Sequence, residues 1–191
     1  AWFGLDSTAL VARGVRVGAT VSAYKDAVRL GATRFTGRAM DDRVGSLALL
    51  RAVGMVDPAT LTRRVLFVWS TEEEVGLNGA AALAARLGPT VQRVHSIDTF
   101  VSSESPLESP HFAYARLGEG PVLRGIESQS MWPPAARAEV ERIARAAGIP
   151  LQVGMTQGGT DGTAFVFYGA PNLPLSWPGR YSHAPGEVLD L

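Results

Sequence analysis

The stretch Arg63-Arg64-Val65-Leu66-Phe67-Val68-Trp69-Ser70-Thr71-Glu72-Glu73-Glu74-Val75-Gly76-Leu77-Asn78-Gly79-Ala80 decides how this chain folds. Residues 65–69 are apolar, β-branched and aromatic, which predicts a short buried strand. Carboxylates directly after such a strand are costly unless water, a cation or a proton relay receives them. Because ligands of open α/β sheets gather beyond the carboxyl ends of the strands, residues 72–74 are candidates for a functional site. The alternative is a solvated acidic turn before a helix over residues 80–87.

Composition excludes several classes of protein. The 191 residues suffice for one domain with its own core. Eighteen basic and eighteen acidic residues give no net charge, so we expect neither nucleic acid nor an acidic membrane surface as a partner. No apolar run reaches about 18 residues, so no membrane span is expected. The absence of cysteine excludes disulfides and thiolate metal sites but leaves the compartment open.

Two patterns precede the acidic stretch. Alternating residues such as those of 15–21, interrupted by glycines, predict strands and turns of a small β region over residues 1–36. Asp41 and Asp42 then stand before apolar residues at helical spacing, so either could cap a helix. Two aspartates at a helix start would also suit a cation, and this segment alone does not decide between the cap and the ligand.

Three further patterns follow the acidic stretch. Residues 92–100 predict a strand that ends on Asp98, and residues 101–112 form a loop long enough to line a site, with His111 expected at the surface. Residues 133–148 predict an amphipathic helix, stopped by Gly148 and Pro150, and a strand begins at residue 152. Gly158-Gly159-Thr160-Asp161 precedes a short helix and would either cap it or expose backbone N–H groups and a carboxylate to a cleft.

The combination of these patterns points to a metal site. Acidic residues stand at three separate elements, and one histidine follows late in a constrained loop; they are Asp41, Asp42, Glu73, Glu74, Asp98 and His183. Carboxylates with an imidazole suit Zn, Co or Mn, and a carboxylate can bridge two ions. Two ions held about 3.5–4 Å apart can clamp an attacking hydroxide and a substrate carbonyl together.

The chain resembles the co-catalytic metallo-aminopeptidases of the glutamyl and deblocking type, whose best-known members assemble as tetrahedral TET particles. The matching segments occur in the family's order; they are Gly37-Arg38-Ala39-Met40-Asp41-Asp42-Arg43-Val44-Gly45, Thr71-Glu72-Glu73-Glu74-Val75-Gly76-Leu77-Asn78-Gly79-Ala80, Asp98, Gly158-Gly159-Thr160-Asp161 and Arg180-Tyr181-Ser182-His183. The separation of the Asp-Asp-Arg-x-Gly and Glu-Glu-x-Gly segments is specific. The Gly-Gly-Thr-Asp run alone is a weak signal.

The resemblance implies a role for each matched residue. Asp41 would bridge two metal ions, with Asp42 supporting the ligands. Glu73 would be the general base that activates a metal-bound water, whereas Glu72 receives no role. Glu74 and His183 would complete the first metal site, and Asp98 would be a ligand of the second. Gly158, Gly159 and Asp161 would line the substrate cleft.

One departure from the family concerns the second metal site. The family adds a histidine from a His-x-Asp motif far upstream, and no histidine precedes residue 37 here. The chain also begins with Ala1 and not Met, so we expect a fragment or a processed chain. Residues 1–36 resemble the end of a β-rich dimerisation insert, and residues 37–191 the C-terminal part of the catalytic domain. Three explanations stay open: the missing part was removed, another chain supplies it, or the gene is short. This chain could also bind one metal ion instead of two.

These observations predict an α/β fold in which helices sandwich a mixed central sheet, with a small β-rich N-terminal remnant. The expected function is metal-dependent removal of N-terminal residues from short peptides by a cytoplasmic enzyme, which would form a homo-oligomer when full-length. Two alternatives are an inactive remnant that binds a peptide or partner and a related metal-dependent amidohydrolase or deacylase.

Overall fold

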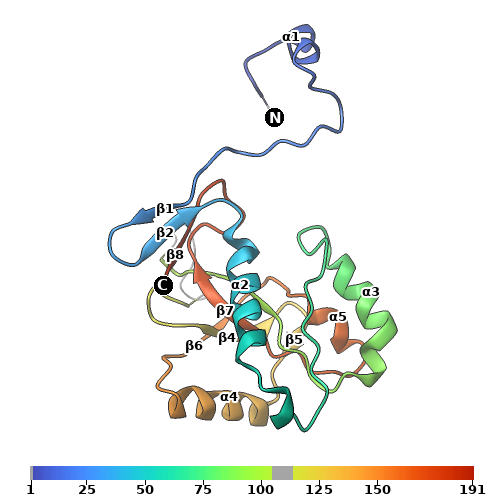
Figure 1. Ribbon diagram of the computed structural model, residues 1–191, viewed down its shortest axis with the longest axis vertical. Helices are drawn as coiled ribbons and strands as arrows, with labels where there is room; N and C mark the ends of the chain where they lie inside the picture. Colours follow the sequence, from blue (N-terminus) through green and yellow to red (C-terminus); the bar gives the residue numbers. More distant parts are fainter. Residues whose placement is uncertain (1, 105–113) are drawn as a thin grey trace.

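The structure, a computed structural model, describes residues 2–104 and 114–191 and has the predicted α/β composition (Figure 1). The expected loop at 101–112 and its His111 therefore lie largely outside the described residues. The helices are α1 (Ser7–Ala12), α2 (Met40–Met55), α3 (Asn78–Leu87), α4 (Pro134–Ala146) and α5 (Thr163–Val166), with short 3-10 turns at Pro58–Thr60 and Gly88–Thr90. The strands are β1 (Val28–Leu30), β2 (Arg34–Gly37), β3 (Ile97–Val101), β4 (Val122–Glu127), β5 (Ser130–Met131), β6 (Gln152–Met155), β7 (Leu175–Gly179) and β8 (Glu187–Asp190).

The central sheet is mixed, as predicted. Its strands follow the order β3-β7-β4-β5, and β6 also pairs with β4. The β3–β7 and β4–β6 pairs are parallel, whereas β4 is antiparallel to β7 and β5. Parallel strands need crossover connections, and α4 supplies the one between β4 and β6.

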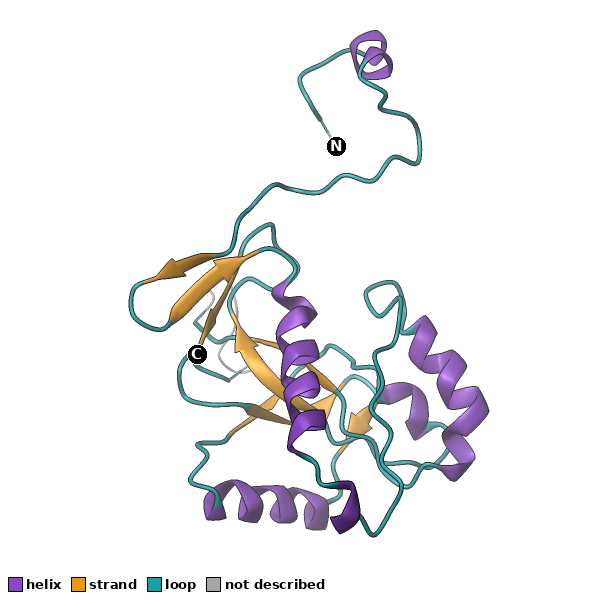
Figure 2. Ribbon diagram, viewed as in Figure 1, coloured by secondary structure: helices purple, strands orange, loops and turns teal. Residues whose placement is uncertain are grey.

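Helices lie around this sheet (Figure 2). α2 packs against β3 and β7. The buried residues Leu123, Trp132 and Leu173 form one core cluster, against which Ala136 and Val140 of α4 pack. A second cluster joins Ala84 of α3 to Phe165 of α5. This core fixes the ends of the strands and α2, from which the site residues project.

A smaller sheet of β1, β2 and β8 covers one end of the molecule. β2 pairs with β8 along its length, so the chain's last strand closes onto residues 34–37. The predicted domain boundary between residues 36 and 37 falls inside β2, and it stays a prediction. Figure 1 shows the segment before β1, including α1, extending away from the rest of the molecule.

Two predicted strands are wrong. Residues 15–21 form no strand, and Val17 is fully exposed, because no described strand lies beside them to accept their hydrogen bonds. Residues 65–69 also form no strand, and four of their five side chains are exposed. An apolar segment such as residues 65–69 is buried only if another part of the protein packs against it, and no described part of this chain does so here.

The helices predicted after Asp42, over residues 80–87 and 133–148 and after Asp161 are confirmed as α2, α3, α4 and α5. The strand predicted from residue 152 is confirmed as β6, but Asp98 lies near the start of β3 and not at its end. Among the described residues, no helix combines the length and hydrophobicity needed to cross a bilayer.

Candidate metal centre

Asp41 and Asp42 lie at the start of α2, where the backbone has not yet become helical. The Asp42 carboxylate accepts a hydrogen bond from the Gly45 amide at 3.0 Å and so caps the regular part of the helix. A Cβ at Gly45 would lie 2.1 Å from Asp42 Oδ2, so only glycine fits there. Buried Glu187 of β8 accepts the amides of Met40 and Asp41 at 2.6 and 3.1 Å. The cap predicted for this pair is therefore present, and β8 fixes the backbone of Asp41.

Glu73 and Glu74 lie in a turn that leads into α3. The Glu73 carbonyl accepts hydrogen bonds from the amides of Gly76 and Leu77 at 3.1 and 3.0 Å, which closes the turn. The Gly79 amide donates to the Thr71 carbonyl at 2.9 Å, and a Cβ at Gly79 would lie 2.6 Å from the Thr71 backbone. This close approach requires glycine, and it holds the two glutamates at the edge of the molecule where α2 begins.

His183 lies in the loop between β7 and β8 and meets both acidic segments. Its Nε2 atom is 3.3 Å from Asp41 Oδ2 and 3.2 Å from Glu74 Oε2. One ligand atom from each of these three residues lies within 4.8 Å of the other two. Ser182 also donates a hydrogen bond to Asp41 Oδ2 at 3.0 Å. The structure thus brings together the three residues that the sequence assigns to the first metal site.

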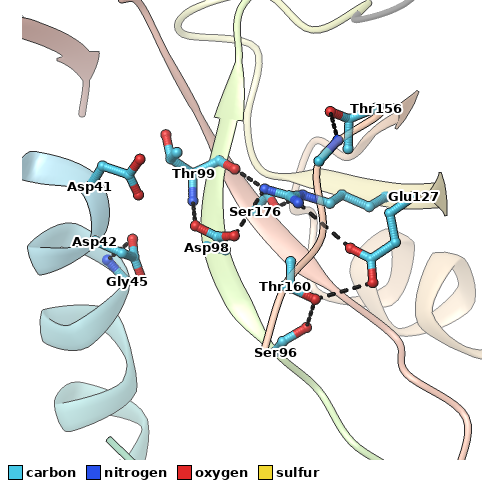
Figure 3. A network of polar contacts seen from close by, with 12 residues as sticks. Asp41, Asp42, Gly45, Ser96, Asp98, Thr99, Glu127, Thr156, Thr160 and Ser176 are labelled. Atoms are coloured by element: carbon cyan, nitrogen blue, oxygen red, sulfur yellow. Dashed lines mark hydrogen bonds and ion pairs between the residues drawn. The ribbon is translucent and has the colours of Figure 1, made fainter. Parts of the chain in front are cut away.

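Asp98 of β3 faces the two aspartates of α2 (Figure 3). Oxygen atoms of Asp41, Asp42 and Asp98 lie within 4.8 Å of one another, so Asp41 belongs to both clusters. Asp42 Oδ1 accepts hydrogen bonds from Trp177 Nε1 at 2.7 Å and from Gly45, which orients its carboxylate. The arrangement allows Asp42 either the supporting role expected from the sequence or direct ligation.

Sequence reasoning missed the buried pair Arg124 and Glu127 behind Asp98. Arg124 Nη2 lies 3.3 Å from Asp98 Oδ2, and Arg124 Nη1 lies 3.6 Å from Glu127 Oε2. Both side chains are almost inaccessible to solvent. Hydroxyl and amide groups of four residues donate to Glu127 Oε1; they are Ser130, Thr160, Thr163 and Asn172. Two charged residues three apart in the apolar strand 122–127 were the signal that could have revealed this pair.

Replacing Arg124 with Met is expected to lower the free energy of unfolding by about 3 kcal/mol, because it leaves the buried carboxylates of Glu127 and Asp98 without their cation. The matched control is Arg137→Met, which breaks an exposed pair with Glu141 and should cost about 0.5 kcal/mol. Urea unfolding of both variants measures the difference. Equal, small losses in the two variants would contradict this assignment.

A cleft of about 370 Å³ opens beside the two clusters. Glu73, Glu74, Asp98 and His183 are among the residues that line it, together with Gly158 and Gly159. Asp161 is absent from the described lining residues of this cleft; its carboxylate instead accepts a hydrogen bond from the Ser70 hydroxyl. Asp161 still lies near enough to influence the charge of Glu73.

Crowding of carboxylates changes their acidity. Burial, followed by the charges of Glu74, Asp161 and Asp41, raises the pKa of Glu73 to about 7. Burial raises the pKa of Asp98 to about 8, although Arg124 acts in the opposite direction. The pKa of Glu74 is also raised, chiefly by burial and then by Asp41. A divalent cation placed among these groups would favour their ionised forms.

The metal-free chain is expected to lose stability as pH rises from about 5 to about 8. Folded pKa values of about 7 for Glu73 and about 8 for Asp98 exceed their ordinary values, so folding favours the protonated forms and this contribution disappears once both groups ionise. Thermal unfolding in EDTA and in added Zn, Co or Mn, at pH 5.5 and 8, measures this. The stabilisation by metal should be larger at pH 8, and a metal-free Tm that increases over this range would contradict the expectation.

The donor atoms present fit a divalent metal. Two carboxylates and an imidazole from three different elements converge in the first cluster, and three carboxylates converge in the second. Oxygen and imidazole nitrogen donors suit Zn, Co or Mn, and a carboxylate in both clusters suits a bridge. Glu73 lies at the same cleft outside both clusters, so it is free to exchange a proton.

The chain is similar to known proteins along most of its length. The family model described as M42 glutamyl aminopeptidase matches residues 3–191. FrvX of Escherichia coli K12 is 31% identical over 180 residues, which cover 93% of this chain and 49% of FrvX. The TET1 peptidase of Pyrococcus horikoshii, which can assemble into a tetrahedron or a large octahedral shell, is 34% identical with a TM-score of 0.76 and covers 86% of this chain and 48% of its own.

The aminopeptidase APDkam598 of Desulfurococcus kamchatkensis is 29% identical with a TM-score of 0.82, over 97% of this chain and 52% of its own. Each of these alignments includes most of the present chain. The chain therefore spans about half the length of the relatives it matches.

Proposed function

Because this chain belongs to the M42 glutamyl aminopeptidase family, we propose that it supplies the general base and most of the metal ligands of a metal-dependent aminopeptidase. The observation that carries the proposal is the convergence of Asp41, Glu74 and His183 within 4.8 Å beside the cleft that Glu73 lines. We propose that these three residues hold one divalent ion, and that Asp41 and Asp98 hold a second, with Asp42 in support.

The ions, when bound, would polarise the carbonyl of the first peptide bond and make water a stronger acid. Glu73 would take a proton from the attacking water and later pass it to the leaving amine. Burial raises the pKa of Glu73 to about 7 in the metal-free chain, and a bound cation would lower it, so Glu73 would be ionised near neutral pH and able to accept the proton. Glu74 lies next to Glu73 in the chain but would be occupied as a ligand, so the two carboxylates would have different roles.

The cleft would hold the peptide substrate between the acidic clusters and the Gly158-Gly159 turn. Backbone without side chains on that wall allows a peptide to approach closely. Asp161 would influence the substrate's free N-terminus through its charge, because it lies near Glu73 although outside the lining. Attraction of an ammonium group to this acidic surface would favour removal of N-terminal residues over internal cleavage.

Release of nitroaniline from aminoacyl nitroanilides tests the proposal. The chain with added Zn, Co or Mn should hydrolyse these substrates, and EDTA should abolish hydrolysis. An N-acetylated anilide is the matched control, and its rapid cleavage would favour an amidohydrolase or deacylase. The inactive remnant would be favoured if the chain bound peptide without turnover both by itself and when mixed with the half of a relative that this chain does not span.

Other properties of the whole protein stay proposals. The Pyrococcus TET1 peptidase forms closed shells, which supports a homo-oligomer for a full-length form of this protein. A cytoplasmic location and the choice among Zn, Co and Mn stay predictions from the sequence.

A further inference from the structure

The buried side chain of Arg124 on β4 lies between two acidic side chains. Its Nη2 atom is 3.3 Å from Oδ2 of Asp98, and its Nη1 atom is 3.6 Å from Oε2 of Glu127. Figure 3 shows Asp98 and Glu127 at the two ends of this set of contacts. Arg124 also donates from Nε to Ser176 Oγ at 2.9 Å and from Nη2 to the Thr99 carbonyl. These contacts fix the guanidinium group against Asp98.

The two carboxylate oxygens of Glu127 have different surroundings. Oε1 accepts hydrogen bonds from four side chains, including Ser130 Oγ at 2.6 Å and Asn172 Nδ2 at 2.7 Å. Oε2 is buried and accepts no hydrogen bond from the described parts of the chain, so the charge of Arg124 is its main interaction there. The donors on Oε1 therefore hold the carboxylate in place and keep the charge of Oε2 beside Arg124.

The stability of the fold does not by itself explain a buried pair of Arg124 and Glu127. The cost of desolvating two charges offsets much of their attraction, so buried ion pairs are weak evidence for stability. This pair lies beside the proposed metal centre, because Arg124 contacts Asp98, one of the three carboxylates of the second cluster. An uncompensated guanidinium there would repel a divalent cation, and little water is present to screen it.

We propose that Glu127 is a positioning residue of the second metal site: it neutralises Arg124, so that the guanidinium orients Asp98 without repelling the ion. Arg124 donates to Asp98 Oδ2, and the Thr99 amide donates to Asp98 Oδ1 at 2.7 Å, so both oxygens are held. Residues that orient a ligand change metal affinity by about 10–100-fold. The inference rests on the proposed function, because it requires that Asp98 binds the second ion.

Glu127→Gln removes the charge and keeps the size of the side chain. Calorimetric titration with Zn, Co or Mn should show the second ion binding about 10–100-fold more weakly, whereas the affinity of the ion held with His183 should change by less than about threefold. The matched control is Glu141→Gln, which breaks a surface pair with Arg137 at 2.7 Å and should change neither affinity. Equal weakening of both ions would indicate a structural role and overturn the proposal.

The double variant Arg124→Met/Glu127→Gln tests the neutralisation itself. It should bind the second ion at least about fivefold more tightly than Glu127→Gln does, because no uncompensated cation remains beside Asp98. Absence of this recovery would overturn the proposal. If Glu127→Gln does not fold, folding and second-ion binding by the double variant would support the neutralisation, and failure of both variants to fold would overturn it.

A metal-free measurement separates this inference from the proposed hydrolysis. In the Glu127→Gln chain, Asp98 is the acidic partner that Arg124 retains among its described contacts. Asp98→Asn should therefore change the unfolding equilibrium constant, measured in urea, at least about fivefold more in this chain than in the unmodified one. Additive effects would overturn the link between Glu127 and Asp98. Coupled effects in a chain that binds no second ion would support this link and contradict the proposed metal site.

Discussion

Glu73→Gln is expected to lower the rate of anilide hydrolysis by about a thousandfold, because a general base contributes about 10²–10⁴-fold. Glutamine keeps the size of the side chain but cannot take a proton from water. The proposed ligands Asp41, Glu74 and His183 are untouched, so metal content should stay at the level of the unmodified chain. The kcat for anilide hydrolysis by the metal-loaded protein measures the loss of rate. Elemental analysis of the same preparation measures the metal content.

Glu72→Gln is the matched control for this variant. Glu72 precedes Glu73 directly, is exposed and accepts a hydrogen bond from Asn78 Nδ2 at 3.1 Å, outside both metal clusters. Its substitution should change kcat by less than about twofold, since surface changes away from special features have small effects. Equal losses in the two variants would remove Glu73 from the role of base. Loss of metal in Glu73→Gln would make it a ligand instead.

Asp41→Asn is expected to weaken binding of both metal ions by at least about 100-fold, because even residues that only support ligands cost 10–100-fold. Asp41 is the residue shared by the two carboxylate clusters, and it is nearly buried, with 6% of its side chain exposed. Asparagine preserves its shape and can still accept the Ser182 hydrogen bond. The loss of metal affinity would therefore result from the missing negative charge and not from unfolding at the start of α2. Calorimetric titration with Zn, Co or Mn measures both binding steps.

Two further variants assign the individual ions. His183→Ala should weaken mainly the ion held with Glu74, and Asp98→Asn mainly the other. Asp57→Asn, at an exposed aspartate that caps a 3-10 turn, should leave both ions bound. If Asp98→Asn reduced the affinity of both ions equally, the division into two sites would be wrong.

The short-range features of the site were predictable from the sequence. Asp41-Asp42 before helical spacing predicted the start of α2, and Asp42 does cap it. The same local logic predicted α3 after Gly79 and α5 after Asp161. These predictions succeed because a cap or a tight turn involves residues only a few positions apart. The types of donor atom were likewise visible, since carboxylates and histidine are recognised without coordinates.

Burial was less predictable. Residues 65–69 have the composition of a core strand, yet four of the five are exposed and none has a backbone hydrogen bond within the described chain. Composition shows that a segment can be buried; it does not show which neighbour buries it. For Arg124 and Glu127 the error is the opposite one: their charges predict exposure, yet both are buried. Their burial is possible because Arg124 pairs with Glu127 and Asp98 in the folded chain.

The sequence by itself determined the α/β class, the helices near the site and the identity of the acidic and histidine side chains, because periodicity and capping are local properties. The family resemblance implied that His183 shares a site with Asp41 and Glu74, but only the tertiary structure brings it to them, across 142 and 109 positions, through the pairing of β7 with β3 and of β8 with β2. It also decided which apolar residues stay uncovered. Distances between remote residues depend on how the whole sheet is assembled, and no local pattern contains that information.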